Sequence, residues 1–172
     1  MYPEAYRQFL FHFHGDRDYF ECHEVLEEYW KEDAPPERKQ YWVGLIQLAV
    51  GLYHQRRENF SGAYRMIKNS LSIIKTEEKM ILKLGIDYQK LITLLEERLS
   101  EIKLKKPYTS INLPITDNNL LTDCIQNCKK QGLQWGLTNA PTDEYIINKH
   151  KLRDRSDVIE ERDRQMEIKK KR

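Results

Sequence analysis

Apolar residues recur three and four positions apart through most of the first hundred residues, a spacing that predicts amphipathic helices. Asp, Asn, Gly and Pro residues interrupt the apolar stripes and mark where helices begin and end. The predicted helices cover residues 3–14, 16–32 and 36–58, then 59 to about 74, then 87–106. The third is apolar on nearly all sides between Tyr41 and Tyr53, which is typical of the central helix of a bundle.

The pattern changes in the last third of the chain. Residues 108–115 are rich in β-branched side chains and predict a short extended segment. Residues 117–131 predict a short helix, and a highly charged helical stretch follows a turn at 139–142. We therefore expect an all-α fold, with a bundle of about five core helices in residues 1–106 and a C-terminal helical extension in residues 107–172.

Composition agrees with this interpretation and limits the function classes. Charged residues make up 33% and apolar residues 40% of the 172 positions, a mix typical of a soluble helical protein. The formal net charge is +2, so no strong field favours nucleic acid or an acidic substrate. From Lys149 to Arg172 there are ten Lys or Arg and six Asp or Glu residues, which we interpret as a solvated helix rather than a nucleic-acid arm.

The cysteines and the lengths of the apolar runs predict a cytoplasmic protein. Three cysteines, an odd number, in a sequence with no secretory signal pattern favour a reduced, cytoplasmic protein. The longest apolar run, residues 41–53, is too short to span a bilayer, so we expect no membrane association. Cys124 and Cys128 form a lone C-x₃-C pair without a second pair, which is more typical of core residues than of a zinc site.

Residues 20–30 carry the most chemical information. In a helix, His23, Glu27 and Trp30 stand at i, i+4 and i+7 on one face, and Tyr19 falls on the same half of the helix. The opposite half takes most of the glutamates. An ionisable pair on the core-facing side is costly unless it is partnered, and we therefore predict a site at this face.

A second stripe lies on the predicted central helix. Its members are polar or lack a side chain and follow each other at spacings of three and four: Gln40, Gly44, Gln47, Gly51, His54 and Glu58. Glycine inside a helix costs about 1 kcal/mol relative to alanine. The two glycines therefore predict that a large side chain approaches this helix, and Trp30 or Tyr29 of the preceding helix would fit there.

Antiparallel packing of these two helices would let the two faces meet. His23, Glu27 and His54 would then supply two imidazoles and one carboxylate, a ligand set that suits Zn, Fe or Mn with open coordination positions. Gln47 would orient a ligand or substrate, and Trp30, Tyr19 and Gly51 would line the pocket. The leading hypothesis is a metal-dependent hydrolase or lyase with an unidentified small-molecule substrate.

The rival hypothesis is a non-catalytic interaction or scaffold module. In it, the His, Glu and Gln side chains form a closed hydrogen-bond network that fixes the register of the helices. The charged tail would then bind a partner protein or pack in a homodimer, and catalysis without a metal is a third reading. His12 and His14 are interpreted as surface or boundary residues, and His150 introduces the alternating charges of the tail.

The His23-x₃-Glu27-x₂-Trp30 motif has companions in a fixed order. They are the Gly15 helix entry, the segment 44–49, His54 and the segment 59–63. Together they resemble domain of unknown function family 309, a family of small all-helical bacterial and archaeal proteins. The resemblance covers roughly residues 8–75, and it implies an all-α fold and metal binding at the motif. The residues after about 107 would be an extension outside the core of the family.

Overall fold

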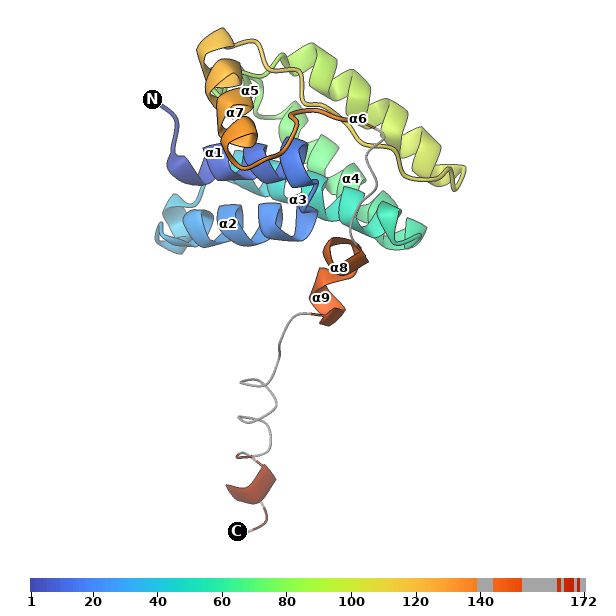
Figure 1. Cartoon of the computed structure of the whole chain (residues 1–172). Helices are drawn as coiled ribbons and strands as arrows, with labels where there is room; N and C mark the ends of the chain where they lie inside the picture. Colours follow the sequence, from blue (N-terminus) through green and yellow to red (C-terminus); the bar gives the residue numbers. More distant parts are fainter. Residues whose placement is uncertain (139–143, 153–163, 165, 169, 171–172) are drawn as a thin grey trace.

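The computed structural model describes residues 1–138, 144–152, 164, 166–168 and 170, and Figure 1 shows helices joined by loops. The elements are α1 (Glu4–Phe11), η1 (His12–Asp16), α2 (Tyr19–Lys31), η2 (Pro35–Glu37), α3 (Gln40–Arg56), α4 (Phe60–Lys75), α5 (Glu78–Lys83), α6 (Tyr88–Lys103), α7 (Asn118–Lys130), α8 (Glu144–Ile147) and α9 (Lys149–Leu152). The all-α prediction is confirmed. Within the described ranges the only β pairing is an isolated antiparallel bridge between Ile86 and Ile115. None of the described helices combines the length and the apolar character needed to cross a bilayer.

Four long helices begin at residues that the sequence marks as caps. The side chains of Asp18, Asn59, Asp87 and Asp117 accept hydrogen bonds from backbone N–H groups in the first turns of α2, α4, α6 and α7. Such a cap stabilises a helix by about 1 kcal/mol because it satisfies an otherwise unpaired amide. Local chemistry therefore fixes these four boundaries.

Two helix boundaries differ from the sequence prediction, and one helix is additional to it. The first helix closes with η1, a π-helical turn that ends at Arg17 in the left-handed conformation with φ 55°. The third helix begins at Gln40 rather than at residue 36, because Pro35 and Pro36 form the separate 3₁₀ turn η2. The short helix α5 was not predicted, since its six residues span too few turns for a clear apolar period. The predicted turn at 139–142 lies outside the described residues.

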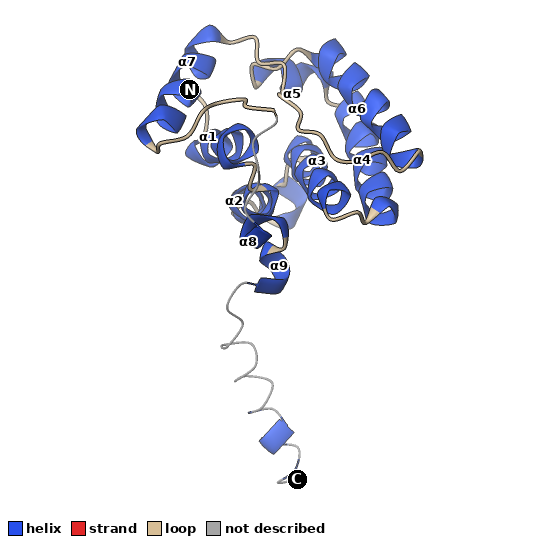
Figure 2. Cartoon of the chain, turned by 45° about the vertical axis from the view of Figure 1, so that its right-hand side comes forward, coloured by secondary structure: helices blue, strands red, loops and turns tan. Residues whose placement is uncertain are grey.

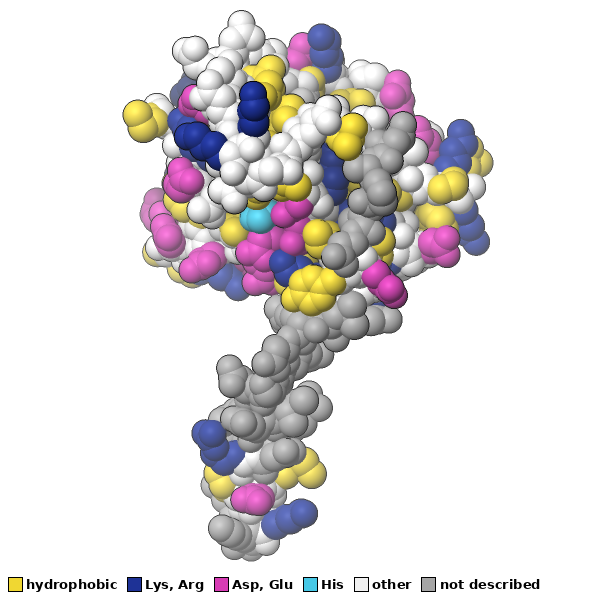
Figure 3. Space-filling view, in the orientation of Figure 1, with side chains coloured by type: hydrophobic (Ala, Val, Ile, Leu, Met, Phe, Trp, Pro, Cys, Tyr) yellow, Lys and Arg dark blue, Asp and Glu magenta, His cyan; other side chains and the backbone are white. Residues whose placement is uncertain are grey.

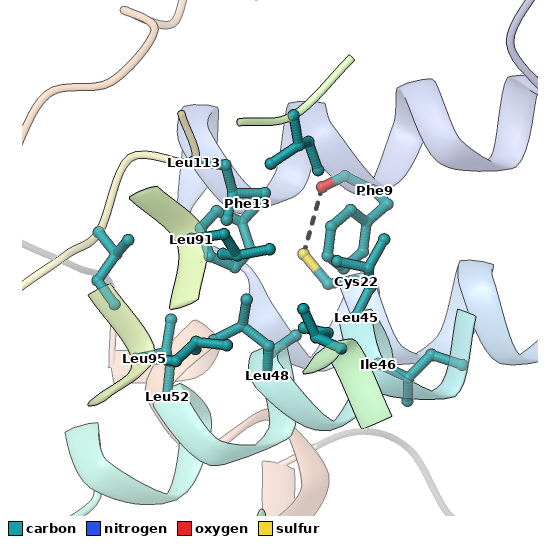
Figure 4. Packing of buried hydrophobic residues seen from close by; sticks show 14 of the residues in the cluster. Phe9, Phe13, Cys22, Leu45, Ile46, Leu48, Leu52, Leu91, Leu95 and Leu113 are labelled. Carbon is teal, nitrogen blue, oxygen red and sulfur yellow. Dashed lines mark hydrogen bonds between the residues drawn. The ribbon is translucent and has the colours of Figure 1, made fainter. Parts of the chain in front are cut away.

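Helix α3 is the centre of the bundle, as predicted. It packs against α2 on one side and α4 on the other, with α6 beyond α4 and α1 over α2 (Figures 1 and 2). Leu45, Leu48 and Leu52 of α3 are fully buried, and Figure 4 shows them beside Phe9 and Phe13 from the first two elements. Burying a leucine side chain stabilises the fold by about 1.5–3 kcal/mol.

The glycines of α3 lie against α4, whereas the sequence predicted that α2 would approach them. A Cβ atom at Gly51 would lie 2.5 Å from Cδ1 and 2.7 Å from Cγ1 of Ile67 on α4. At Gly44, the carbonyl oxygen accepts a 2.7 Å hydrogen bond from the Ser70 hydroxyl, again from α4. The expectation that Trp30 or Tyr29 approaches these positions is therefore wrong. The glycine stripe lets α4, not α2, come close to α3.

Residues 107–138 pack directly on the bundle. Arg17 donates hydrogen bonds to the Ile111 carbonyl at 2.7 Å and to the Asn112 side chain at 2.6 Å, and Arg98 donates to the Thr109 carbonyl at 2.6 Å. Ile111, Leu113, Leu120 and Cys124 belong to the same hydrophobic cluster as the bundle helices. The proposed division into a core of residues 1–106 and an extension of residues 107–172 stays a prediction, and these two arginines tie its two sides together.

Candidate functional site

A small pocket lies between α2, α3 and α9, with a volume of about 180 Å³. Its walls are almost entirely apolar, although they include three histidines. The lining residues are Tyr19, Phe20, His23, Val50, Tyr53, His54 and His150. Tyr19, His23 and His54 were expected at a common site, and the fold brings all three around one space.

His23 stands at the rim of this pocket in contact with two glutamates of its own helix. Its Nε2 atom is 2.5 Å from Oε2 of Glu27, and its Nδ1 atom is 3.5 Å from Oε1 of Glu24. The second oxygen of Glu27 lies 2.8 Å from Nζ of Lys31, and this hydrogen bond is the main cause that lowers the pKa of Glu27. The side chains of His23 and Glu27 are 30% and 29% exposed, so the pair expected to face the core lies half-buried at the surface.

His54 enters the pocket from the last turn of α3. The Asn59 side-chain oxygen accepts the Gly62 N–H at 3.1 Å, which orients the amide so that its NH₂ group faces Nδ1 of His54 at 3.4 Å. Partial burial lowers the pKa of His54, and the charges of Arg57 and Arg65 lower it further. The ring is therefore neutral at pH 7. Because Nδ1 accepts a hydrogen bond, the network assigns the proton to Nε2.

His150 reaches the pocket from the C-terminal segment and contacts Tyr53 of α3. The backbone N–H of His150 donates to the Tyr53 hydroxyl oxygen at 3.2 Å. The same hydroxyl is hydrogen-bonded to Nδ1 of His150, and since the oxygen accepts from the backbone, its own proton is available for the ring nitrogen. Phe20 and Tyr53 also pack against each other, with ring centroids 5.9 Å apart.

The other predicted site residues lie away from the pocket. Glu27 is held by His23 and Lys31 outside the lining, and Gly51 packs against α4. Trp30 stacks under the guanidinium of Arg38, 4.8 Å from its ring centroid. Within the part of the chain that the structure describes, the buried Trp30 Nε1 and Gln47 Oε1 atoms have no hydrogen-bond partner. The proposed closed His–Glu–Gln network therefore does not include Gln47 in this structure.

The three predicted metal ligands do not converge on one point. Among the described residues, three potential ligand atoms lie within 4.8 Å of one another only in His12, Asp16 and Asp18. Those groups already have partners, because His12 Nδ1 is 3.1 Å from Asp16 and an Asp18 oxygen is 2.8 Å from Nζ of Lys149. His23 and Glu27 meet at the rim as two candidate ligands, without His54.

The interpretation of His14 as a surface or boundary residue is wrong. The side chain is fully buried, and its ring stacks on Trp135 with centroids 4.0 Å apart. Nδ1 lies 2.9 Å from the Leu10 carbonyl, and Nε2 accepts the Leu113 N–H at 2.9 Å. His14 is therefore a structural residue that links the π-helical turn to the extended segment.

The fold and pocket define an all-α protein with a histidine-lined cavity between two adjacent helices. A family model described as "Domain of unknown function (DUF309)" matches residues 6–66. The chain is 49% identical over 171 residues to "Uncharacterized protein YpuF" of Bacillus subtilis (strain 168), covering 99% of this chain and 98% of the relative. No solved structure gives a significant match. The chain belongs to the DUF309 family, which confirms the resemblance. The matched range includes His23 and His54 but not His150.

Proposed function

We propose that the pocket binds a small planar anion, a molecule of about one six-membered ring that carries a carboxylate. Size and wall chemistry support this ligand class: the cavity of about 180 Å³ is slightly larger than an apolar cavity of about 150 Å³ that accommodates benzene. Rings from Tyr19, Phe20 and Tyr53 supply flat apolar surfaces on which an aromatic ring can pack.

Charge at the His54 end of the pocket supports the anionic group of this ligand. The neutral His54 ring offers an Nε2–H donor, and the positive charges of Arg57 and Arg65 lie near enough to lower its pKa. A carboxylate oxygen accepting from Nε2 would be stabilised by both arginines. Glu27 disfavours the reverse orientation, because its negative charge stands at the His23 end. The observation that carries this proposal is the apolar pocket with His54 in its wall, close to the positive charges of Arg57 and Arg65.

A divalent metal is the second candidate, because His23 and Glu27 place an imidazole and a carboxylate next to each other beside the pocket. These donor types suit Zn, Fe or Mn, and His54 would be the third ligand of the predicted set. Such an ion would polarise a carbonyl or supply hydroxide. The donor set fits a metal, but its placement does not, since His54 does not join the rim pair within 4.8 Å. The metal-dependent hydrolase hypothesis therefore ranks second.

The ligand proposal is tested by titrating ¹⁵N-labelled protein with sodium benzoate and following backbone amide shifts. At about 0.4–0.5 kcal/mol per non-hydrogen atom, benzoate would bind with a Kd of about 1 mM. We expect saturable shifts around Tyr19 and Val50 and much weaker shifts with benzylamine, which has the same ring and the opposite charge. The variant Val50→Phe fills the pocket and should abolish binding, while Ile125→Phe on the exposed side of α7 should not.

Equal benzoate affinity in Val50→Phe and Ile125→Phe would contradict the proposal. The metal candidate is tested separately, by elemental analysis of untagged protein and of the His23→Ala variant. About one equivalent of Zn, Fe or Mn, lost in the variant, would reverse the ranking of the two candidates. No response to benzoate or to any of the metals would contradict both candidates and favour the non-catalytic interaction module.

A further inference from the structure

The C-terminal segment, residues 144–152, covers one side of the pocket by contacts to both of the helices that form it. On the α3 side, Arg57 Nε donates a hydrogen bond to the Asn148 side-chain oxygen at 3.2 Å. The backbone N–H of His150 donates a hydrogen bond to the Tyr53 hydroxyl oxygen. On the α2 side, Nζ of Lys149 lies 2.8 Å from an Asp18 oxygen and 3.0 Å from a Glu21 oxygen. The segment therefore bridges the two walls.

Lys149 makes the closest charged contacts between the segment and the bundle. Burial disfavours its charged form, but the hydrogen bonds that Lys149 donates to Asp18 and Glu21 outweigh burial and raise the pKa of Lys149. The Lys149 side chain is 18% exposed and that of Asp18 is 6% exposed, so salt screens this pair less than a surface pair. Asp18 is also held rigidly, because its other oxygen caps α2. Figure 3 shows acidic side chains gathered on the face where the segment meets the bundle.

No side chain described in residues 144–150 is fully buried, although Ile146 and Ile147 are half-buried. Helix α8 contains no buried residue, and Tyr145 is 46% exposed. A segment without fully buried side chains opens locally at a lower free-energy cost than the buried core. The hydrophobic cluster of the bundle, by contrast, draws its members from the helices and from residues 107–138. The segment can therefore leave while the bundle stays folded.

We propose that residues 144–152 form a lid over the ligand pocket, which Lys149 latches to Asp18 and Glu21, and whose opening widens the entrance through which a ligand enters and leaves. This inference rests on the proposed ligand pocket. In the closed position, His150 supplies the wall that α2 and α3 leave open. Closing over a bound ring shields one side of it from water, which strengthens its contacts and slows its release.

The latch is tested without any ligand by amide hydrogen exchange in the full-length protein. The amide of His150 is the best reporter, because it is hydrogen-bonded to Tyr53 only when the lid is closed. In Lys149→Met, which keeps the aliphatic stem and removes the charge, we expect this amide to exchange about tenfold faster or more. Lys130→Met, an exposed lysine at the end of α7, is the matched control and should exchange like the wild type.

The gating role is tested with benzoate on the same three proteins, by line-shape analysis of the pocket amides. We expect faster dissociation of benzoate and weaker binding in Lys149→Met than in Lys130→Met. Unchanged exchange of the His150 amide in Lys149→Met would overturn the latch. Faster exchange with unchanged benzoate kinetics would overturn the gating role and leave the ligand pocket intact. Absence of benzoate binding in the wild type would overturn the pocket and its gating, while the exchange result would still decide the latch.

Discussion

His14 makes the protein less stable as the pH falls from 7 to 5. Burial lowers the pKa of His14 to about 3, with a further contribution from the charge of Arg17, against an opposing hydrogen bond to Leu10. In the neutral form, both ring nitrogens of His14 make hydrogen bonds, one to the Leu10 carbonyl and one from the Leu113 N–H. A proton on Nε2 would break the hydrogen bond that Leu113 donates. In the unfolded chain the same ring titrates near its ordinary pKa of about 6.5.

The sign and size of the effect follow from this difference. As the pH falls below about 6.5, the unfolded state binds a proton that the folded state does not, so stability falls with pH until about pH 3. At about 1.4 kcal/mol per pH unit, the loss between pH 7 and pH 5 is about 2 kcal/mol. Urea unfolding at both pH values measures this loss in the wild type and in His14→Gln, which keeps a donor and an acceptor but cannot titrate.

We expect the wild type to lose about 2 kcal/mol more than His14→Gln on going from pH 7 to pH 5. Equal losses in the two proteins would refute the assignment of His14 as a buried neutral ring. A matched measurement on His12→Gln controls for histidine titration in general, because the His12 side chain is 21% exposed and paired with Asp16.

Three further predictions concern the core. Gly51→Ala should lower the free energy of unfolding by about 1–2 kcal/mol, because the clash with Ile67 exceeds the gain in helix propensity; a stabilised variant in urea unfolding would contradict the packing of α4 on α3. Arg17→Met should lower the free energy of unfolding by about 2–4 kcal/mol and expose residues 108–115 to limited proteolysis, because the buried carbonyl groups that accept from Arg17 lose their donor. A variant as resistant to the protease as the wild type would contradict the role of Arg17 in holding this segment. The three cysteines are buried and their pKa values are raised by burial, so all should react with a thiol reagent only after unfolding; fast labelling of the native protein would show that the core opens readily.

Local features of the fold could be predicted because their causes lie within a few residues. The caps at Asp18 and Asn59 act on amides three positions away, and the apolar stripe of α3 shows on its own that this helix is central. His23 and His54 could be placed at one site because α2 and α3 are consecutive and joined by a short connection. The helices and one side of the pocket thus follow from short-range patterns.

Long-range contacts account for what could not be predicted. His14 is buried by Leu113, 99 positions away, and His150 meets Tyr53 across 97 positions, and neither pairing leaves a spacing signal in the sequence. The glycines of α3 signalled a close approach, but they could not show from which side it came. The position of Glu27 on its helix predicts that it faces the core, whereas the side chain lies at the surface, where it pairs with Lys31 at 2.8 Å.

The most direct test of the ligand pocket is a crystal structure of the full-length protein soaked with 4-bromobenzoate, located by the anomalous signal of bromine. The proposed function predicts a bromine peak in the cavity lined by Tyr19, Val50 and Tyr53, with the carboxylate at Nε2 of His54. A second, larger groove on the protein is lined by Tyr29 and Tyr41. A bromine peak in that groove instead, or no ordered bromine at a concentration well above the Kd, would contradict the proposed function.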